Sequence, residues 1–399
     1  MRRFVIWIVI GLLSLVFIGN EQSIEISDRA LVHAVGIDKD DSGYTVTLQI
    51  FTSQGSGSDT QIDPSKPNTR VITNKAKTFN EAMALCENQL GNYLFIGHNQ
   101  IIVLGSDTDF SQPDELLNYF IRNRENFLGV DIMLAEKTAQ EILNVQISSG
   151  AITTENFKET VKMYKEKGSL IPSDMVSFLN ECMKPDKSAT LPIVSTKKNE
   201  DKKSSQGEGQ GESGGQSQGG ESGGGGQSGG GSEQQSQNTT YDIKETAVIS
   251  GGKIVGKIDA QQAQCISLMT DKTDYGMITV KYKDEDLGLL LKVRKSKAEV
   301  FVENNKLVHN VNISLTAVTE NNTYTQKDKD NISKEVEKKL KKQCEETYAK
   351  VAGEYNADVF DLYRLVKHFQ PKIYLRYQDN YQLLKDNTIL QVNINCVAK

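Results

Sequence analysis

The stretch SSQGEGQGESGGQSQGGESGGGGQSGGGSEQQSQ, residues 204–237, decides how this chain is divided. All 34 of its residues are Gly, Ser, Gln or Glu, and 14 of the 32 glycines of the chain lie in it. Such a composition buries too little apolar surface to offset the entropy lost on ordering. A nucleotide-binding glycine loop would need a strand before it and a helix after it, and the flanking sequence indicates neither. We therefore predict a disordered linker over residues 197–240 that joins two folded blocks.

The block before the linker, residues 20–196, mixes strand and helix patterns. Apolar runs at residues 30–38 and 44–51 flank the turn sequence KDDSG at residues 39–43, which is typical of a β-hairpin. The strands and helices alternate without a regular βαβ rhythm, which indicates an α+β fold. Helices are expected at 79–90, 113–121, 154–166 and 173–182, and further strands at 95–104, 127–134 and 190–194.

The block after the linker, residues 241–399, has the same mixed character. A long amphipathic helix is expected from about Ile332 to Tyr355, because apolar side chains recur there at spacings of three and four. The last strand alternates apolar and polar side chains from Leu390 to Cys396. This order predicts a sheet of four or five strands with long helices on one face. Further helices are expected at 260–269 and 357–369, and further strands at 246–249, 253–258, 277–282, 288–293, 298–302 and 307–318.

The N-terminus carries the pattern of an exported protein. Arg2 and Arg3 precede Phe4–Gly19, a run of sixteen residues without a charged side chain. As a helix this run would be about 24 Å long, a little short of a hydrocarbon core of about 30 Å. We predict that residues 1–19 form a signal peptide or transmembrane anchor. Because basic residues tend to remain on the cytoplasmic side, the rest of the chain should face outward.

The composition argues against several classes of function. The 46 basic and 52 acidic residues give a formal net charge of −6, whereas a general nucleic-acid binder needs a basic surface. The five cysteines are scattered without a metal-binding spacing, and the chain has only four histidines. No GxSxG or HExxH motif marks a nucleophile or a metal site. We therefore predict a non-enzymatic protein with no catalytic residues, no metal, no cofactor and no nucleic-acid partner.

Two local patterns each allow a sharper and a plainer interpretation. Residues 38–43 (DKDDSG) resemble the start of a calcium loop, but Gln49 stands where such a loop has its closing glutamate. We therefore favour an acidic hairpin turn. The lysines between Lys338 and Lys342 could bind anionic lipid head groups. Glutamates are interleaved with them on the same predicted helix, so we favour the solvated face of an amphipathic helix.

Three further stretches carry a family resemblance. They are ALVHAVGIDKD at residues 30–40, preceded by a Glu-Ile pair, AVISGGKIVGKID at 247–259 and NADVFDLYRLVKHFQP at 356–371. In this order they resemble the Ger(x)C family, the C subunits of the nutrient germinant receptors of bacterial spores. The segment FIGH at residues 95–98 is also similar to the family. The likeness covers both blocks and therefore essentially the whole exported part.

The resemblance implies a lipid anchor whose acceptor residue this sequence lacks. Family members usually carry a Leu-x-Gly-Cys lipobox with an acylated cysteine, and the corresponding residues here look like Phe17 to Asn20. Asn20 has no thiol to acylate, so lipidation by this route is chemically excluded. Phe17 and Gly19 also make a poor site for ordinary signal peptidase. We therefore predict that Phe4–Gly19 stays attached as a membrane anchor.

The resemblance also implies a role and partners. The chain would be a non-enzymatic C subunit on the outer face of the spore inner membrane, needed for the germination response to nutrients. Its partners would be the integral-membrane A and B subunits of the same receptor, and the resemblance does not say whether this subunit binds the nutrient itself. Asp38, Asp358, Phe360 and Tyr363 are the candidate partner interface, because they carry the likeness beside exposed polar positions. A structural requirement would explain these residues about as well.

A different class of function stays open at this point. An exported solute-binding protein could hold a small ligand between the two blocks. Such proteins hinge on short ordered crossovers, whereas the tether predicted here would couple the blocks loosely, about 30 Å apart. A scaffold that engages two partner surfaces at once fits such a tether better.

Overall fold

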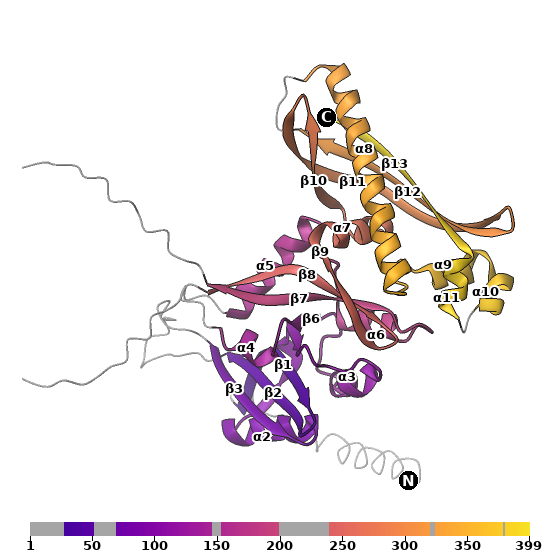
Figure 1. The fold of residues 1–399 in the computed structure, drawn as a ribbon. Coiled ribbons are helices and arrows are strands. Elements are labelled where there is room, and N and C mark those ends of the chain that lie inside the picture. Colours follow the sequence, from indigo (N-terminus) through magenta and orange to yellow (C-terminus); the bar gives the residue numbers. More distant parts are fainter. Residues whose placement is uncertain (1–27, 52–68, 146–152, 199–238, 320–323, 378–379) are drawn as a thin grey trace, which may run out of the picture.

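The protein has an α+β architecture with two sheets (Figure 1). The predicted anchor at residues 1–19 and residues 199–238 of the predicted linker lie outside the residues that the structure describes, whereas residues 197–198 and 239–240 of that linker belong to strands. Within the described part of the chain, no helix is both long enough and apolar enough to cross a bilayer. The mixed fold class predicted from the sequence is confirmed. The computed structural model describes residues 28–51, 69–145, 153–198, 239–319, 324–377 and 380–399.

The first sheet begins with the predicted hairpin and continues with parallel strands. Its strand order is β3-β2-β1-β5-β6-β7, with β4 beside the start of β1. Strands β1, β5, β6 and β7 run parallel, so they begin at the same edge of the sheet, which we call the amino edge. The strands are β1 (Arg29–Asp40), β2 (Gly43–Phe51), β3 (Thr69–Ala76), β4 (Tyr93–Phe95), β5 (Ile101–Leu104), β6 (Asp131–Ala135) and β7 (Ala189–Lys198).

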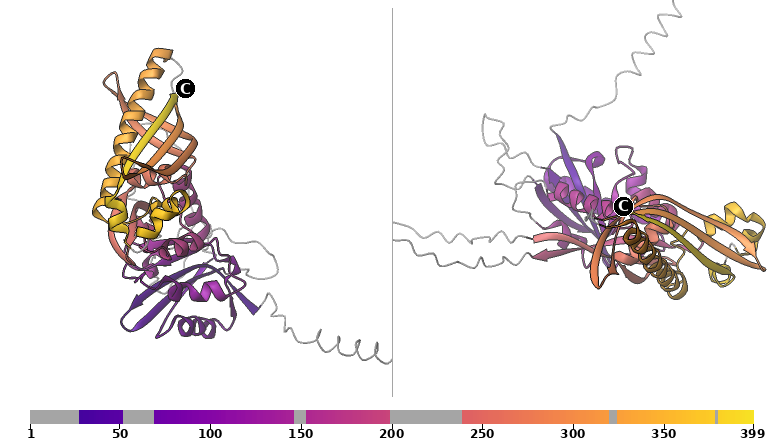
Figure 2. Two further views of the ribbon diagram at one scale, coloured as in Figure 1. Left: turned by 90° about the vertical axis from the view of Figure 1, so that its right-hand side faces the viewer. Right: turned by 90° about the horizontal axis from the view of Figure 1, so that it is seen from above.

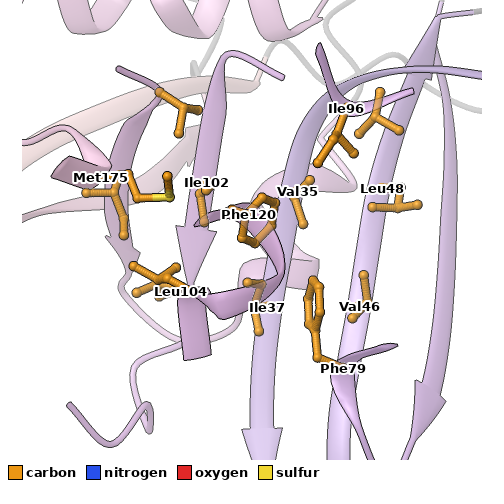
Figure 3. Close-up of a cluster of buried hydrophobic side chains, with 14 of the residues drawn as sticks. Val35, Ile37, Val46, Leu48, Phe79, Ile96, Ile102, Leu104, Phe120 and Met175 are labelled. Carbon is orange, nitrogen blue, oxygen red and sulfur yellow. The ribbon is translucent and has the colours of Figure 1, made fainter. Parts of the chain in front are cut away.

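Helices cover both faces of this sheet because its central strands are apolar on both sides. In β5, Ile102 and Leu104 pack with helices α2 (Phe79–Leu90), α3 (Pro113–Arg122) and α6 (Met175–Cys182). Figure 3 shows this core, with the side chains of Phe79 and Phe120 among those of the strands. The alternate side chains, Ile101 and Val103, pack with α4 (Ala139–Leu143) and α5 (Thr153–Glu166). An alternation of this kind follows from the two-residue period of a strand.

The first sheet continues beyond the predicted linker. Strand β8 (Thr239–Ser250) pairs antiparallel with β7 over most of its length, and β9 (Lys253–Asp259) pairs with β8 (Figure 1). Residues on either side of 199–238 are therefore hydrogen-bonded to each other, and the expectation of two loosely coupled blocks about 30 Å apart is wrong. The entropy cost of closing a loop grows only slowly with its length, so a long insertion between paired strands is tolerated.

The second sheet has four strands and a long helix across one face, as predicted. Its order is β10-β11-β12-β13, and the buried side chains of α8 that pack on it include Ile332, Val336 and Leu340. Figure 2 shows this part of the molecule stacked on the first sheet. The elements are α7 (Ala260–Met269), β10 (Tyr275–Tyr282), β11 (Glu285–Glu303), β12 (Lys306–Val318), α8 (Gln326–Tyr348), α9 (Leu362–Phe369), α10 (Pro371–Tyr377), α11 (Tyr381–Asp386) and β13 (Thr388–Ala398).

Several predicted boundaries differ from the structure for identifiable reasons. The strand expected at 95–104 is interrupted by a 3-10 turn at Ile96–His98. The strands expected at 288–293 and 298–302 are one strand, β11, with a bulge after Val293. The long helix ends in a π-helical turn at Ala349–Glu354. Pro371 begins α10, because a proline at the first position of a helix costs no hydrogen bond.

The lysine cluster on α8 follows the plainer of its two interpretations. Lys341 lies 3.9 Å from Glu345 and Lys342 lies 3.7 Å from Glu346, each pair one helical turn apart. These lysines are exposed, and the apolar stripe of α8 lies on the face toward the sheet. The pattern is that of a solvated helix face with ion pairs spaced by four residues.

Candidate functional site: a buried polar junction

The two sheets meet at a cluster of buried and partly buried charged side chains, which we call the junction. It is formed by Lys184, Asp186 and Ser188, between α6 and β7, and by Asp358 and Asp361, before α9. The second segment follows an unusual backbone path, because φ is 50° at Asn356 and 60° at Asp361. Asn and Asp tolerate this left-handed conformation better than most residues. This path ends the preceding helical segment, and α9 starts only at Leu362. The sequence predicts that this helix begins at Ala357.

Asp358 is the centre of the junction. Its two carboxylate oxygens accept hydrogen bonds from the backbone amides of Leu362, at 2.7 Å, and Tyr363, at 2.8 Å. They thereby satisfy two of the amides that the first turn of α9 leaves free. The backbone amide of Asp358 donates to the carboxylate of Asp186, at 3.0 Å, and to the hydroxyl of Ser188, at 2.9 Å. Asp358 therefore connects α9 to the segment that leads into β7 of the first sheet.

Ion pairs surround this centre. The ammonium of Lys184 lies 2.8 Å from the carboxylate of Asp361, and only 17% and 18% of these side chains are exposed. Asp361 also pairs with Arg364 at 3.0 Å. A second, partly buried pair joins Lys272, which follows α7, to Glu181 of α6 at 2.7 Å. Buried charges require such partners, since an unpaired charge in the interior is costly.

The electrostatics of the junction follow from burial and from its unequal charges. Burial, followed by the neighbouring Asp186, raises the pKa of Asp358 to about 7 against the pull of Lys184. Burial likewise raises the pKa of Asp186. Burial acts to lower the pKa of Lys184, but the carboxylates of Asp361, Asp358 and Glu181 outweigh it, and the pKa rises. Lys184 therefore stays charged, while Asp358 and Asp186 resist the loss of a proton.

This geometry holds parts of the protein together and gives no access to a substrate. Asp358 has no exposed surface, and Phe360 packs against Tyr348 with ring centroids 4.8 Å apart. Tyr363 is also buried. The prediction that these three side chains contact a partner is therefore wrong for the conformation described. The structure brings Asp358, Phe360 and Tyr363 together, but in a buried contact between two segments of the same chain.

Asp38, the fourth predicted interface residue, lies elsewhere and is half-buried. Its carboxylate accepts hydrogen bonds from the backbone amides of Ala139, at 2.7 Å, and Gln140, at 3.0 Å, and so holds the start of α4. Chiefly because of burial, the pKa of Asp38 is raised. It borders a cavity of about 230 Å³ that is also lined by Asp107 and Lys137. A partner contact at Asp38 stays a prediction.

The acidic turn after Asp38 is a hairpin turn, as favoured above. Asp40 pairs with Gly43 in the β1–β2 register, and its carboxylate accepts from the amide of Ser42 at 2.8 Å and forms an ion pair with Lys75. Among the described residues, no group of three or more His, Cys, Asp or Glu side chains is placed to hold a metal ion. All five cysteines are buried free thiols.

Lys184 and Asp186 are the junction residues that sequence reasoning missed. They lie in the short polar segment between a helix and a strand, where charged residues are ordinarily solvated. The nearest signal is the pair of charges on either side of Pro185, which would not by itself separate a buried loop from an exposed one. The loop before α9, about 170 positions later in the chain, packs on them.

A glycine beside the junction offers a test of how tightly the two sheets fit. The ring of Tyr355 lies over Gly256 of β9, and a Cβ there would be 2.3 Å from its Cζ atom. We expect Gly256→Val to displace this ring, to break the hydrogen bond from its hydroxyl to the Lys257 carbonyl, and to lower the free energy of unfolding by about 1–3 kcal/mol. Thermal unfolding measures the loss. Gly288→Val is the control, because its Cβ would meet nothing within 4 Å; an equal loss in both would contradict the tight fit.

Comparison with known proteins agrees with this architecture over nearly the whole described chain. Residues 22–196 match the family described as "Spore germination protein N-terminal domain", and residues 244–398 match "Spore germination B3/ GerAC like, C-terminal". No curated protein matches this chain. A solved structure described as "Crystal Structure of the GerBC protein" has a similar fold, with a TM-score of 0.51 and 16% identity over 91% of this chain and 96% of that one. The chain belongs to the Ger(x)C family of spore germination proteins.

Proposed function

We propose that this protein is a non-enzymatic, membrane-anchored C subunit of a spore germinant receptor, needed for the germination response to nutrients. The observation that supports this most is the match of both parts of the chain, in order, to the two spore germination domains. The fold, similar to that of the GerBC protein, agrees with it.

The partners in this proposal are the integral-membrane A and B subunits of the same receptor. The anchor is Phe4–Gly19, which places the described residues on the outer face of the spore inner membrane. The absence of an acceptor thiol at Asn20 makes this segment, rather than a lipid, the attachment. We propose a non-enzymatic role because Asp358, the carboxylate whose pKa is shifted most, is wholly buried and caps a helix.

The solute-binding alternative gains no support from the junction. A ligand held between the two parts would need a cleft at their meeting point. Instead, Lys184 is paired there with Asp361, and the carboxylate of Asp186 accepts a hydrogen bond from the backbone amide of Asp358. The antiparallel pairing of β7 with β8 also removes the loose tether about which the two parts would have to close.

Deletion of the gene tests the proposal. Heat-activated spores that lack it should fail to lose optical density with some single nutrients, because the receptor would be incomplete. They should still germinate with non-nutrient agents, whose action bypasses receptors. Complementation with the full chain should restore the response, and a chain without residues 4–19 should not. Normal germination with every nutrient, in a strain without a paralogue, would contradict the proposal.

A further inference from the structure

The amino edge of the first sheet is the part of the described protein closest in sequence to the proposed anchor. The described residues begin at Asp28, and β1 starts at Arg29. Arg29 stands beside Tyr93 of β4 in parallel register. Strands β5 and β6 run in the same direction as β1, so the segments that lead into them also lie toward this edge.

The loop that leads into β6, residues 123–130, is fastened to the start of β1. The guanidinium of Arg29 lies 3.1 Å from the carboxylate of Glu125 and stacks over the ring of Phe95, 5.1 Å from its centroid. A Cβ on Gly97 would lie 3.0 Å from the Glu125 carbonyl oxygen, so this loop packs directly on the turn after β4. The loop is therefore held at the amino edge by its own contacts.

This fastened loop presents apolar side chains to solvent. Phe127 is 64% exposed and Leu128 is 43% exposed, and Tyr93 beside Arg29 is 58% exposed. We call these three residues the edge patch. The ring of Phe127 lies over Gly129, where a Cβ would be 2.7 Å from its Cζ atom, so glycine leaves room for the ring at the surface. Exposed basic residues, Arg124 and Lys158, flank the patch.

Chain length limits how far this edge can be from the bilayer. Eight residues, 20–27, separate the proposed anchor from Asp28. Fully extended, they reach about 28 Å, and about 5–8 Å of that is needed to cross the head-group layer of one leaflet. The other end of β1, twelve residues away at the turn beside Asp41, is about 40 Å farther along the strand. The anchor therefore keeps the amino edge within about 20 Å of the head groups, whereas it allows the hairpin turn to lie much farther from the bilayer.

We propose that the amino edge rests on the lipid surface, with Phe127, Leu128 and Tyr93 entering the interfacial region of the bilayer. The inference rests on the proposed anchoring and adds an orientation to it. Aromatic and aliphatic side chains flanked by Arg and Lys suit this region, where apolar bodies are buried and basic groups reach phosphates. Three side chains are far too few for a stable protein interface, which needs about 800 Å² on each partner.

Tryptophan fluorescence in bilayers tests this orientation on the full chain. The chain has one tryptophan, Trp7, inside the proposed anchor, so Trp7→Phe gives a silent background. In that background Phe127→Trp reports on the edge patch, and Asp41→Trp reports on the exposed hairpin turn as the matched control. Both variants are reconstituted into vesicles of phosphatidylcholine and phosphatidylglycerol, with or without bromine on the acyl chains. We expect a blue-shifted emission for Phe127→Trp that loses at least half its intensity with brominated lipid, and no quenching for Asp41→Trp.

The outcomes separate this inference from the proposed anchoring. If both variants float with the vesicles but Phe127→Trp is quenched no more than Asp41→Trp, the orientation is overturned and the anchoring stands. If neither variant floats with the vesicles, the anchoring itself fails, and the orientation fails with it. The same emission can be measured in native spore membranes to which brominated lipid has been added. If it is blue-shifted there but not quenched, the loop lies against a membrane protein, and the lipid assignment is overturned.

Discussion

The Lys184→Met variant should lose about 3–5 kcal/mol of the free energy of unfolding, because it removes the cation from a buried junction. Lys184 lies 2.8 Å from Asp361, and the carboxylates of Asp358 and Glu181 also act on its charge. Methionine fills a similar volume but leaves the charge of Asp361 without its buried partner. Chemical denaturation of the purified protein, followed by circular dichroism, measures the loss.

Lys342→Met is the matched control for this substitution. Lys342 pairs with Glu346 on the exposed face of α8, where 76% of the lysine side chain is accessible. Exposed pairs contribute little, since water and salt screen them. We expect little change in the stability of this variant. If Lys184→Met were as stable as Lys342→Met, the junction would not hold the two sheets together, and the functional-site assignment would have to be given up.

The second large effect concerns pH. Asp358 has a pKa of about 7 in the folded protein, against 3.8 for an ordinary aspartate. The folded state therefore binds this proton more tightly than the unfolded state does. The stability that Asp358 contributes is fully present below about pH 4 and is lost as pH rises to about 7. The loss is on the order of 3 kcal/mol, and Asp186 contributes with the same sign.

The variant Asp358→Asn isolates this contribution. Its amide oxygen can still accept a backbone hydrogen bond at the start of α9, but it has no proton to lose. Other groups have the opposite dependence: burial lowers the pKa of His309 to about 4, so acid destabilises the protein through that residue. The difference between the wild-type and variant unfolding free energies, measured from about pH 4 to about pH 7, cancels such groups. We expect the unfolding free energy of the wild type to fall relative to that of the variant as pH rises. If the two curves stayed parallel, Asp358 would ionise normally.

The elements that depend on local pattern could be predicted from the sequence. Helices α2 and α7 have the predicted bounds, because helical apolar spacing fixes their buried face and local residues fix their ends. In α7, Asp259 and Gln262 form a reciprocal cap with the backbone. The last strand, β13, alternates as predicted, with Val392 and Cys396 buried and Asn393 and Asn395 exposed. The family resemblance likewise rests on short stretches, which can be identified in sequence order without knowing which residues are in contact.

The part of the site that was mispredicted depends on contacts between distant residues. The likeness at residues 356–371 drew attention to Asp358, Phe360 and Tyr363, but nothing nearby in sequence says that a loop around Asp186 buries them. An aspartate before a helix is most often a solvated cap. Whether it also becomes a buried, proton-retaining group depends on what covers it, and its cover comes from about 170 residues earlier in the chain.

The α+β class, most helices and the hairpins could be predicted from the sequence because they rest on composition and on local periodicity, and the family because it rests on short motifs. Three features instead depend on the tertiary structure: β8 joins β7 across residues 199–238, two charged loops form one junction, and the loop that carries the exposed Phe127 is fastened to Arg29 through Glu125. The physical reason is the same in each case. Strand pairing and burial of charge depend on which distant surfaces exclude water together, and a local stretch of sequence carries no record of its distant neighbours.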